Sequence, residues 1–287
     1  MEKEIDPSLE KLIVKLADIV KLDSFVLFGG AVLDTILKRP VADYDIGIEG
    51  SHVDERLTQS LEALESQGFS FITKAKEYPI WNTQRAYVTL AKKEDVLLDI
   101  AVLPSYDNIR FFTVDSMYVQ YPELKIIDEY DAMGAYDRQE IKLARRIDQE
   151  NPYRIATRAI RIGAKYGFPL QNADALWGDL ALRLREWKPD SEFQGPYAYA
   201  EACAKTLRAI VRSKDQPRFS KELLETNILS DLFPELIAPL EYLQGKNEQW
   251  SVASDTELIE KLLSTPVQED EKQAFIARID TIKQYDI

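Results

Sequence analysis

The sequence predicts an α+β protein in which a mixed sheet with helices is followed by an all-helical region. Short runs rich in β-branched and aromatic residues, which are typical of strands, recur within residues 24–103. From about residue 137 this pattern is replaced by apolar residues at helical spacing. A chain of 287 residues is long enough for two ordinary domains. We therefore expect one domain at residues 1–135 and a second at 136–287.

The first domain is expected to contain a mixed sheet of about five strands. The predicted strands cover residues 24–28, 44–48, 69–73, 85–91 and 96–103. Apolar side chains three and four residues apart predict helices over residues 31–38 and 53–67. This alternation of short strands and helices defines the mixed α/β part of the chain.

The second domain is predicted to be helical throughout, with proline residues at the joints between helices. The predicted helices cover residues 137–149, 152–166, 173–187, 197–213, 218–227, 235–243, 255–264 and 267–284. The sequence shows no internal repeat and no low-complexity linker.

Composition excludes several classes of protein. No apolar run approaches the roughly 18 residues that span a bilayer, so no membrane partner is expected. Cys203 is the single cysteine, so an intrachain disulfide is impossible and a reducing, cytoplasmic location is expected. His52 is the single histidine, which excludes a multi-histidine metal site. The net charge of −13 argues, by itself, against a nucleic-acid partner.

Two aspartates and two glycines form the most distinctive local pattern. Gly29 and Gly30 follow a predicted strand and precede a predicted helix, where backbone N–H groups favour a phosphate. Asp43 and Asp45 lie two positions apart on the next predicted strand, so their carboxylates share one face. Paired carboxylates require a compensating cation, and Mg²⁺ prefers such oxygens together with substrate phosphates. We therefore expect Mg²⁺ to bind at this pair.

Asp99 is a candidate third carboxylate. It lies within the apolar predicted strand at residues 96–103, where an aspartate is costly unless it is paired or bound to a metal. Such a group can accept the proton of an attacking 3′-hydroxyl. A solvent-exposed aspartate near the end of the strand is the alternative interpretation.

At these residues the sequence resembles the nucleotidyltransferase superfamily that includes polymerase β. Within it, the chain is most similar to the bacterial-type (class II) CCA-adding enzymes and poly(A) polymerases. Their GGxVRD and DxD motifs are similar to residues 29–34 and 43–45 here, and the resemblance extends over about residues 24–240. It implies a polymerase-β-like head followed by a helical neck and body. It also implies that Asp43 and Asp45 hold the metal ions, and that Gly29 and Gly30 hold the nucleotide triphosphate.

Two further segments carry the resemblance. Residues 109–117 are similar to the family segment RRDFTINAM and keep Arg110, which is expected to neutralise phosphate charge. Residues 150–168 are similar to the neck pattern EDPLRILRAIRFAAKLGF, whose Asp and following Arg read the base in the family. The corresponding pair here is Asn151 and Arg154, because a side-chain oxygen accepts from the base amino group and a guanidinium donates to the ring nitrogen.

The same predicted helix carries two more arginines. Arg158 and Arg161 follow Arg154 at i+4 and i+7, so all three line one helical face and are expected to bind phosphate. A solvated basic helix face is the alternative explanation of this spacing.

The sequence also departs from the family motifs at several positions. These departures are Leu33, Ile109, Phe111, Asp115 and Asn151. Lost arginines weaken triphosphate binding, whereas the intact aspartate pair favours an active enzyme.

The function most consistent with these features is a template-independent, Mg²⁺-dependent nucleotidyltransferase. It would add AMP or CMP from ATP or CTP to an RNA 3′ end, with tRNA as the expected acceptor. Two alternatives remain open: a nucleotidyltransferase that modifies a small molecule or a protein, and a non-catalytic nucleotide- or RNA-binding relative.

Positive charge is concentrated in two segments in spite of the acidic total. Residues 138–165 contain eight Lys and Arg against three acids, and residues 205–221 contain six against one. These segments are where the resemblance implies contacts to triphosphate and RNA, so the net charge alone does not exclude a nucleic-acid partner.

Overall fold

The computed structural model describes residues 5–50, 55–81, 84–103, 105–106, 112–144, 151–187, 194–245 and 250–284, without the side chains of residues 76–86 and 194–196. The chain forms two compact units, which are described separately. The first unit comprises Met1–Arg138 and Leu143–Gln149, and the second comprises Gln139–Lys142 and Glu150–Ile287. The sequence predicts a division at residue 135, whereas the first unit continues to Arg138 and also includes Leu143–Gln149.

The first unit is built on one mixed sheet of seven strands in the order β3-β4-β5-β2-β1-β6-β7. The strands are β1 (Phe25–Phe28), β2 (Tyr44–Glu49), β3 (Ser70–Trp81), β4 (Gln84–Lys93), β5 (Val96–Leu103), β6 (Tyr118–Tyr121) and β7 (Lys125–Ile127). Among these strands, only β2 and β5 pair in parallel. The five predicted strands are confirmed, but the sheet also includes β6 and β7. These strands have four and three residues, too few to show a clear alternation.

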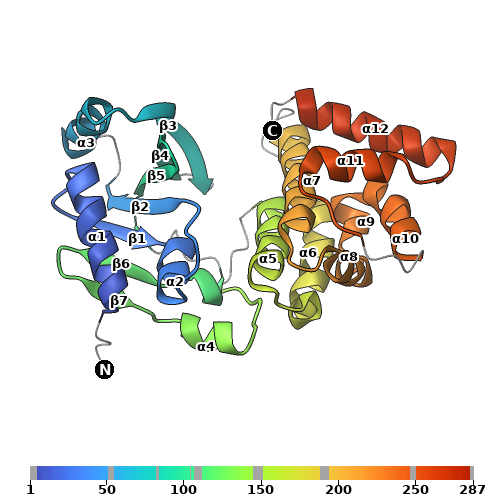
Figure 1. Cartoon of the computed structure of the whole chain (residues 1–287), viewed down its shortest axis with the longest axis horizontal. Coiled ribbons are helices and arrows are strands. Elements are labelled where there is room, and N and C mark those ends of the chain that lie inside the picture. The colour runs from blue at the N-terminus through green and yellow to red at the C-terminus, as the bar shows by residue number, and fades with distance from the viewer. Residues whose placement is uncertain are drawn as a thin grey trace. The chain divides into compact units, whose positions relative to one another are not determined.

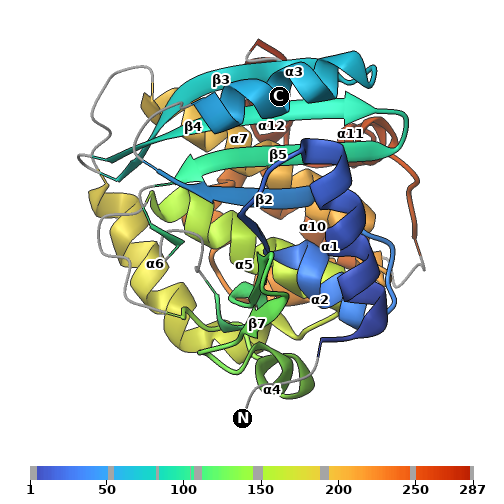
Figure 2. The same ribbon diagram turned by 90° about the vertical axis from the view of Figure 1, so that its left-hand side faces the viewer.

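Three helices cover one face of this sheet, as Figure 2 shows. They are α1 (Pro7–Val20), α2 (Gly30–Ile36) and α3 (Glu55–Ser66). Helix α1 is not among the predicted helices, although Asp6 caps it and four of its apolar residues at helical spacing are buried: Leu9, Ile13, Leu16 and Val20. The unit also contains η2 (Thr113–Asp115) and α4 (Ala132–Asp137).

The alternation of side chains along β2 and β5 directs their isoleucines and their aspartates to opposite faces of the sheet. Ile46, Ile48 and Ile100 are almost completely buried, as expected on the face that the helices cover. Asp45 and Asp99 therefore point to the opposite face, because successive residues of a strand alternate. The parallel pairing of β2 with β5 thus decides which polar side chains meet.

The second unit is helical throughout its described residues. Its elements are α5 (Pro152–Tyr166), η3 (Leu170–Ala173), α6 (Asp174–Glu186), α7 (Gln194–Arg212), α8 (Gln216–Glu225), α9 (Leu229–Leu232), η4 (Pro234–Leu236), α10 (Ile237–Gly245), α11 (Asp255–Leu263) and α12 (Glu269–Gln284). Each predicted helix from residue 152 onward has a counterpart. The predicted helix at 137–149 is wrong over residues 138–144, which are not helical, and its remainder lies outside the described residues.

The centre of the second unit is the contact between α5 and α7, which lie side by side in Figure 1. Ile160 of α5 and Ile210 of α7 are fully buried. Gly163 lets the segment after α5 approach closely, because a Cβ there would lie 2.5 Å from Leu170 Cδ2. Among the described residues, no helix is long and apolar enough to span a membrane.

Candidate nucleotidyl-transfer site

Three predicted aspartates lie on one face of the first unit's sheet. Asp43 immediately precedes β2, and Asp45 lies within it. The parallel register places Asp45 directly opposite Asp99 of β5. Because residues two apart share a face, Asp43, Asp45 and Asp99 are directed to the side of the sheet away from α1, α2 and α3. We call this set the carboxylate face.

The Asp99 carboxyl is perturbed by its burial and, to a smaller extent, by a neighbouring carboxylate. Burial and the nearby Asp43 carboxylate raise the pKa of Asp99 from 3.8 to about 6. Both effects disfavour the charged form, since a buried carboxylate loses hydration and a second carboxylate repels it. At neutral pH Asp99 is still mostly ionised, and its pKa is near the range that suits a proton acceptor. This perturbation marks the carboxylate face as a candidate functional site.

Gly29 lies directly against the carboxylate face. It follows β1 with φ of +70°, a conformation that residues with a side chain rarely adopt. A Cβ at this position would lie 2.8 Å from Asp45 Oδ2. The antiparallel register of β1 and β2 explains this approach, because Phe28 pairs with Asp45. Gly30 is the first residue of α2. Among the described residues, the N-cap Gly29 provides no side-chain hydrogen bond to the backbone N–H groups of its first turn.

The oxygen atoms of the carboxylate face suit a divalent cation that the protein coordinates only in part. Asp43 and Asp45 could provide two hard carboxylate ligands, and Asp43 is close enough to Asp99 to add to the rise in pKa that burial causes. Within the described part of the chain, no three His, Cys, Asp or Glu side chains converge as a metal site. Mg²⁺ is commonly held by one or two carboxylates while water and substrate phosphates supply the rest, so these residues fit it.

Asn151 begins α5 in the second unit. Its Oδ1 accepts a hydrogen bond from the Tyr153 backbone N–H at 2.9 Å, and Pro152 occupies the first helical position. Asn151 is therefore a typical helix N-cap. The oxygen that the sequence analysis assigned to base recognition is engaged with the backbone.

The predicted arginine face of α5 is present. Arg154 and Arg161 are exposed and Arg158 is partly exposed, whereas Ile155 and Ile162 of the same helix are buried. The three arginines share one side of α5, as their spacing predicts. Lys205 lies on α7, which packs against α5. Burial lowers the pKa of Lys205, and the charges of Arg154 and Arg161 lower it to a smaller extent.

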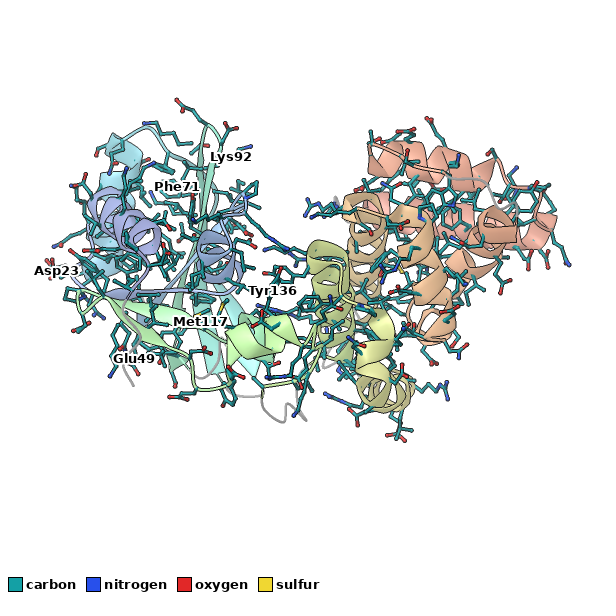
Figure 3. All side chains as sticks on the ribbon, turned by 60° about the horizontal axis from the view of Figure 1, so that its bottom comes forward. Asp23, Glu49, Phe71, Lys92, Met117 and Tyr136 are labelled. Atoms are coloured by element: carbon teal, nitrogen blue, oxygen red, sulfur yellow. The ribbon has the colours of Figure 1, made fainter. Side chains whose placement is uncertain are left out.

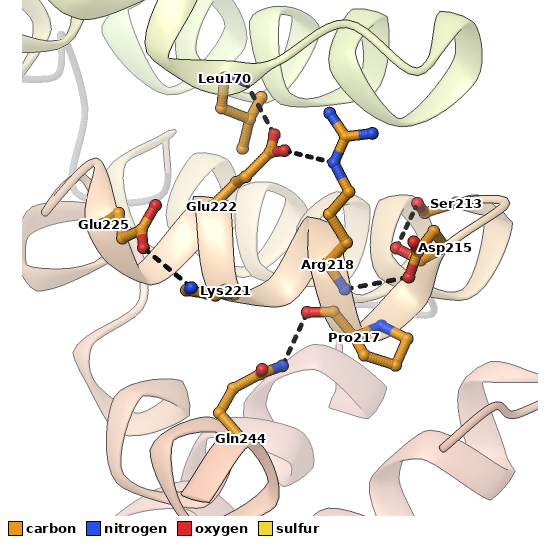
Figure 4. Close-up of polar contacts among 9 residues, drawn as sticks. All are labelled: Leu170, Ser213, Asp215, Pro217, Arg218, Lys221, Glu222, Glu225 and Gln244. Atoms are coloured by element: carbon orange, nitrogen blue, oxygen red, sulfur yellow. Dashed lines mark hydrogen bonds and ion pairs between the residues drawn. The ribbon is translucent and has the colours of Figure 1, made fainter. Parts of the chain in front are cut away.

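The basic segment at residues 205–221 carries less uncompensated charge than its sequence suggests. Four of its six cations form ion pairs: Lys205–Glu201, Arg208–Asp255, Arg218–Glu222 and Lys221–Glu225. Figure 4 shows two of these pairs along α8. All four acids lie outside the segment, which is why the local count of residues 205–221 missed them.

Glu222 shows how one acid can serve two structural roles. Its Oε1 accepts from Arg218 Nε at 2.7 Å, and its Oε2 accepts from the Leu170 backbone N–H at 3.1 Å (Figure 4). Arg218 is consequently part of a structural contact between α8 and η3.

Several positions of the family motifs lie outside the described residues or have structural roles. Arg110, Ile109 and Phe111 are not among the described residues, and neither is His52. Leu33 is buried in α2.

Asp115 replaces the family asparagine. It accepts a hydrogen bond from the Phe112 backbone N–H at 3.1 Å and so stabilises η2. Its carboxylate therefore has a local structural role.

The link between α2 and β2 also contains an arginine that the sequence analysis did not single out. Arg39 Nη2 donates to the hydroxyl of Tyr136, labelled in Figure 3, at 2.8 Å. This contact fixes α4 against the segment that leads to Asp43.

Together, the mixed seven-stranded sheet and the helical second unit define an α+β fold, with a sheet-based first unit followed by an all-α body. Solved structures of tRNA nucleotidyltransferases share this fold. A structure described as a tRNA-processing enzyme in apo form I matches 100% of this chain and 79% of its own, with a TM-score of 0.60 and 14% identity.

Two further solved structures give similar values. A CCA-adding enzyme with CTP matches 98% of this chain and 69% of its own at 18% identity, with a TM-score of 0.56. The Thermotoga maritima CCA-adding enzyme complexed with tRNA matches 99% of this chain and 70% of its own at 17% identity, with a TM-score of 0.55. No protein-family model and no curated protein matches the sequence. At these identities the likeness establishes the fold.

Proposed function

We propose that this protein is a template-independent nucleotidyltransferase that transfers AMP or CMP from ATP or CTP to the 3′ end of an RNA, with tRNA as the expected acceptor. The observation that carries the proposal is the register of β2 with β5, which aligns Asp45 and Asp99 on the face that Asp43 also shares. Its fold is also that of solved CCA-adding enzymes.

The proposed roles follow from the chemistry of the residues. Asp99 accepts the proton of the attacking 3′-hydroxyl, for which its pKa of about 6 is suitable. Gly29 and Gly30 leave space for a triphosphate beside Asp45, because a side chain at Gly29 would occupy that space. In this proposal the 3′-oxygen bonds to the α-phosphorus and pyrophosphate leaves.

Asp43 and Asp45 are the residues that would hold Mg²⁺. When bound, the ion would neutralise phosphate charge and polarise the phosphoryl oxygens. The crowding of carboxylates around Asp99 supports this assignment, since a cation would relieve it.

Recognition of the nucleotide base is proposed for Arg154, with phosphate contacts by Arg110, Arg158 and Arg161. Because the Asn151 oxygen caps α5, we expect Asn151 to orient Arg154 through the helix and to contact the base only if this cap opens. This expectation differs from the family pair, in which a carboxylate reads the base.

A second candidate function is transfer to a cationic small molecule or a protein. The ion pairing of four cations in residues 205–221 favours it, because paired cations attract an RNA backbone less strongly. The net charge of −13 suits a cationic acceptor.

One experiment tests these functions together. The full-length protein is incubated with Mg²⁺, total RNA and each labelled nucleoside triphosphate in turn, and the labelled products are sized. We expect label from ATP or CTP in RNA of tRNA size, and none with Asp43→Asn or Asp45→Asn. Label in a small molecule or in protein would favour the second candidate. No transfer with any nucleotide and any of these acceptors would refute both.

A further inference from the structure

Arg278 of α12 and Glu235 of η4 form an enclosed ion pair in the second unit. Arg278 Nη2 and Nε donate to Glu235 Oε1 at 2.7 and 3.1 Å. The two side chains are only 21% and 15% exposed, whereas those of the Lys221–Glu225 pair of α8 are 68% and 57% exposed. An enclosed pair is costly to break, because the remaining charge would be left uncompensated. The pair therefore fixes α12 to η4.

Tyr199 of α7 contacts both members of this pair. The Arg278 guanidinium carbon lies 4.1 Å from the centroid of the Tyr199 ring, which is a cation–π geometry. The Tyr199 hydroxyl donates to Glu235 Oε2 at 3.3 Å. Burial raises the pKa of this hydroxyl, so it remains a donor at neutral pH. Side chains from α7, η4 and α12 thus form one cluster.

Tyr153 connects this cluster to the beginning of α5. Its ring centroid lies 5.6 Å from that of Tyr199 and 5.5 Å from that of Trp187, both in edge-to-face arrangements that favour one ring orientation. The backbone N–H of Tyr153 donates to Asn151 Oδ1, which is the N-cap hydrogen bond of α5. Direct contacts therefore lead from Arg278 to this cap. We call Arg278, Glu235, Tyr199 and Tyr153 the α5–α12 network.

We propose that Arg278 is a positioning residue for nucleotide selection, which acts through Tyr199 and Tyr153 to keep the N-cap of α5 closed. Buried polar networks rigidify the elements that they join when their hydrogen bonds are made. While the cap is closed, Asn151 Oδ1 is engaged with the backbone, and the base is read by Arg154, which follows Tyr153 in the chain. This inference rests on the proposed function, which assigns base recognition to Arg154.

The state of the cap has a consequence for specificity. A guanidinium only donates, so Arg154 favours adenine and cytosine, whose ring nitrogen on the pairing edge accepts, over guanine and uracil, whose ring nitrogen donates. An amide both donates and accepts, so a free Asn151 side chain can bond to any of the four bases. Opening of the cap should therefore reduce the preference for ATP and CTP over GTP and UTP.

The first test measures the cap itself, by hydrogen exchange of the Tyr153 backbone amide in the full-length protein without nucleotide, followed by NMR. Arg278→Met is expected to speed this exchange about fivefold, because Tyr199 loses its cation and Glu235 loses its partner. Arg278→Lys should restore most of the protection, since it keeps the positive charge over the ring.

Phe275→Leu is the matched control for a general loosening of α12. Phe275 is buried on the same helix, one turn before Arg278, and stacks on Phe233 with ring centroids 6.0 Å apart. We expect this variant to change the exchange of the Tyr153 amide by less than about twofold. Equal acceleration by Arg278→Met and Phe275→Leu would overturn the proposal, because the docking of α12 alone would then explain the effect.

The second test measures selectivity, as the affinity of the full-length protein for each of the four nucleoside triphosphates with Mg²⁺ and no acceptor. The ratio of the affinity for ATP to that for GTP should fall about tenfold in Arg278→Met and recover in Arg278→Lys. Phe275→Leu should leave the ratio unchanged. Equal weakening of all four nucleotides in Arg278→Met would overturn the proposal, since a purely structural role predicts that result.

A second variant keeps the proposal testable if Arg278→Met does not fold. Tyr199→Leu removes the ring that joins Arg278 to Tyr153, but it leaves the ion pair of Arg278 with Glu235 in place. It should speed exchange of the Tyr153 amide and lower the same affinity ratio. A folded Tyr199→Leu protein with unchanged exchange and an unchanged ratio would overturn the proposal.

Neither test requires nucleotide transfer, so the two proposals can fail separately. Transfer by the unmodified protein, with the exchange and the affinity ratio unaffected by Arg278→Met, refutes only the positioning role of Arg278. A changed exchange and ratio in Arg278→Met, with no transfer by the unmodified protein to any acceptor, refutes only the proposed function.

Discussion

The carboxylate face of the first unit and the basic segment 205–221 of the second differ in whether their charges are paired with opposite charges. On the carboxylate face, like charges are brought together, and the pKa of Asp99 rises to about 6 through burial and this repulsion. In the basic segment, four of six cations are paired with acids. Repulsion between carboxylates lowers the stability of the folded protein unless a cation relieves it. The carboxylate face is therefore the stronger candidate for a binding site, because its charge would attract a cationic ligand.

The difference also shows why counts of charge along a sequence are a poor guide to surface charge. Asp45 and Asp99 are far apart in the chain but are register partners. Arg208 and Asp255 are also far apart, yet their side chains are 3.3 Å apart. Tertiary contacts thus concentrate charge in one region and cancel it in the other.

The largest effect is expected from the aspartates that define the carboxylate face. Asp45→Asn should reduce nucleotide transfer about 10³-fold or more, because losing several kcal/mol of charge stabilisation has that effect on rate. Glu49→Gln is the matched control, since Glu49 lies on the same strand and face but at its exposed end. Transfer rates with labelled ATP and CTP and thermal unfolding are measured for both. Similar rates for Asp45→Asn and Glu49→Gln would show that the carboxylate face is not the transfer site.

The close approach of Gly29 to Asp45 gives the next effect. Gly29→Ala should destabilise the protein by about 2–4 kcal/mol, through its positive φ and the contact with Asp45. Gly68→Ala separates the two causes, because Gly68 has φ of +85° and a Cβ there would meet nothing within 4 Å. That control should cost only about 1 kcal/mol. Denaturant unfolding measures both, and equal losses would contradict a specific role for the Asp45 contact.

Asp99 should affect activity and stability in opposite directions. Asp99→Asn should reduce transfer about 10²-fold if Asp99 accepts the proton. The same change should stabilise the folded protein at pH 7 by about 1–3 kcal/mol, because one pKa unit corresponds to about 1.4 kcal/mol. Asp95→Asn, in the exposed turn before β5, is the control. Equal transfer rates for the two variants would contradict the role of Asp99 as proton acceptor.

The effect of Asp99→Asn on the free energy of unfolding should depend on pH. The pKa of this group is raised on folding, so its ionisation costs no folding free energy below about pH 3.8 and the full amount above about pH 6. The stability difference between Asp99→Asn and the unmodified protein should therefore grow between these pH values. Urea unfolding at pH 4, 5, 6 and 7 measures it, and a constant difference would exclude the raised pKa.

The smallest effect concerns the basic segment. Arg212 has no ion-pair partner among the described residues, whereas Arg218 is paired with Glu222. If RNA binds here, Arg212→Met should lower the slope of log affinity against log salt by about one, and Arg218→Met by much less. RNA affinity at four salt concentrations provides this slope. Equal slopes for the two variants would show that ion pairing does not decide which cations meet RNA.

Much of the fold could be predicted from the sequence because its signals are local. The strands around Gly29 and Asp45 and the helix beginning at Pro152 follow from hydrophobic periodicity, turn residues and a proline in the first turn. The short strands β6 and β7 could not be predicted, since three or four residues carry too little periodicity. Residues 138–144 were wrongly predicted to be helical because their residues have helical spacing. In the structure they form a turn and an irregular segment, with an isolated β-bridge between Leu143 and Phe112.

The sequence by itself determined the fold class, the aspartate pair and the arginine spacing of α5, because each depends on residues within one or two turns or strands. Only the tertiary structure decided that Asp99 lies opposite Asp45 and that Arg208 pairs with Asp255. These relations depend on strand register and on helix packing between residues far apart in the chain. The helices and strands of the two units thus follow from local sequence, whereas the arrangement of their charged side chains depends largely on long-range contacts.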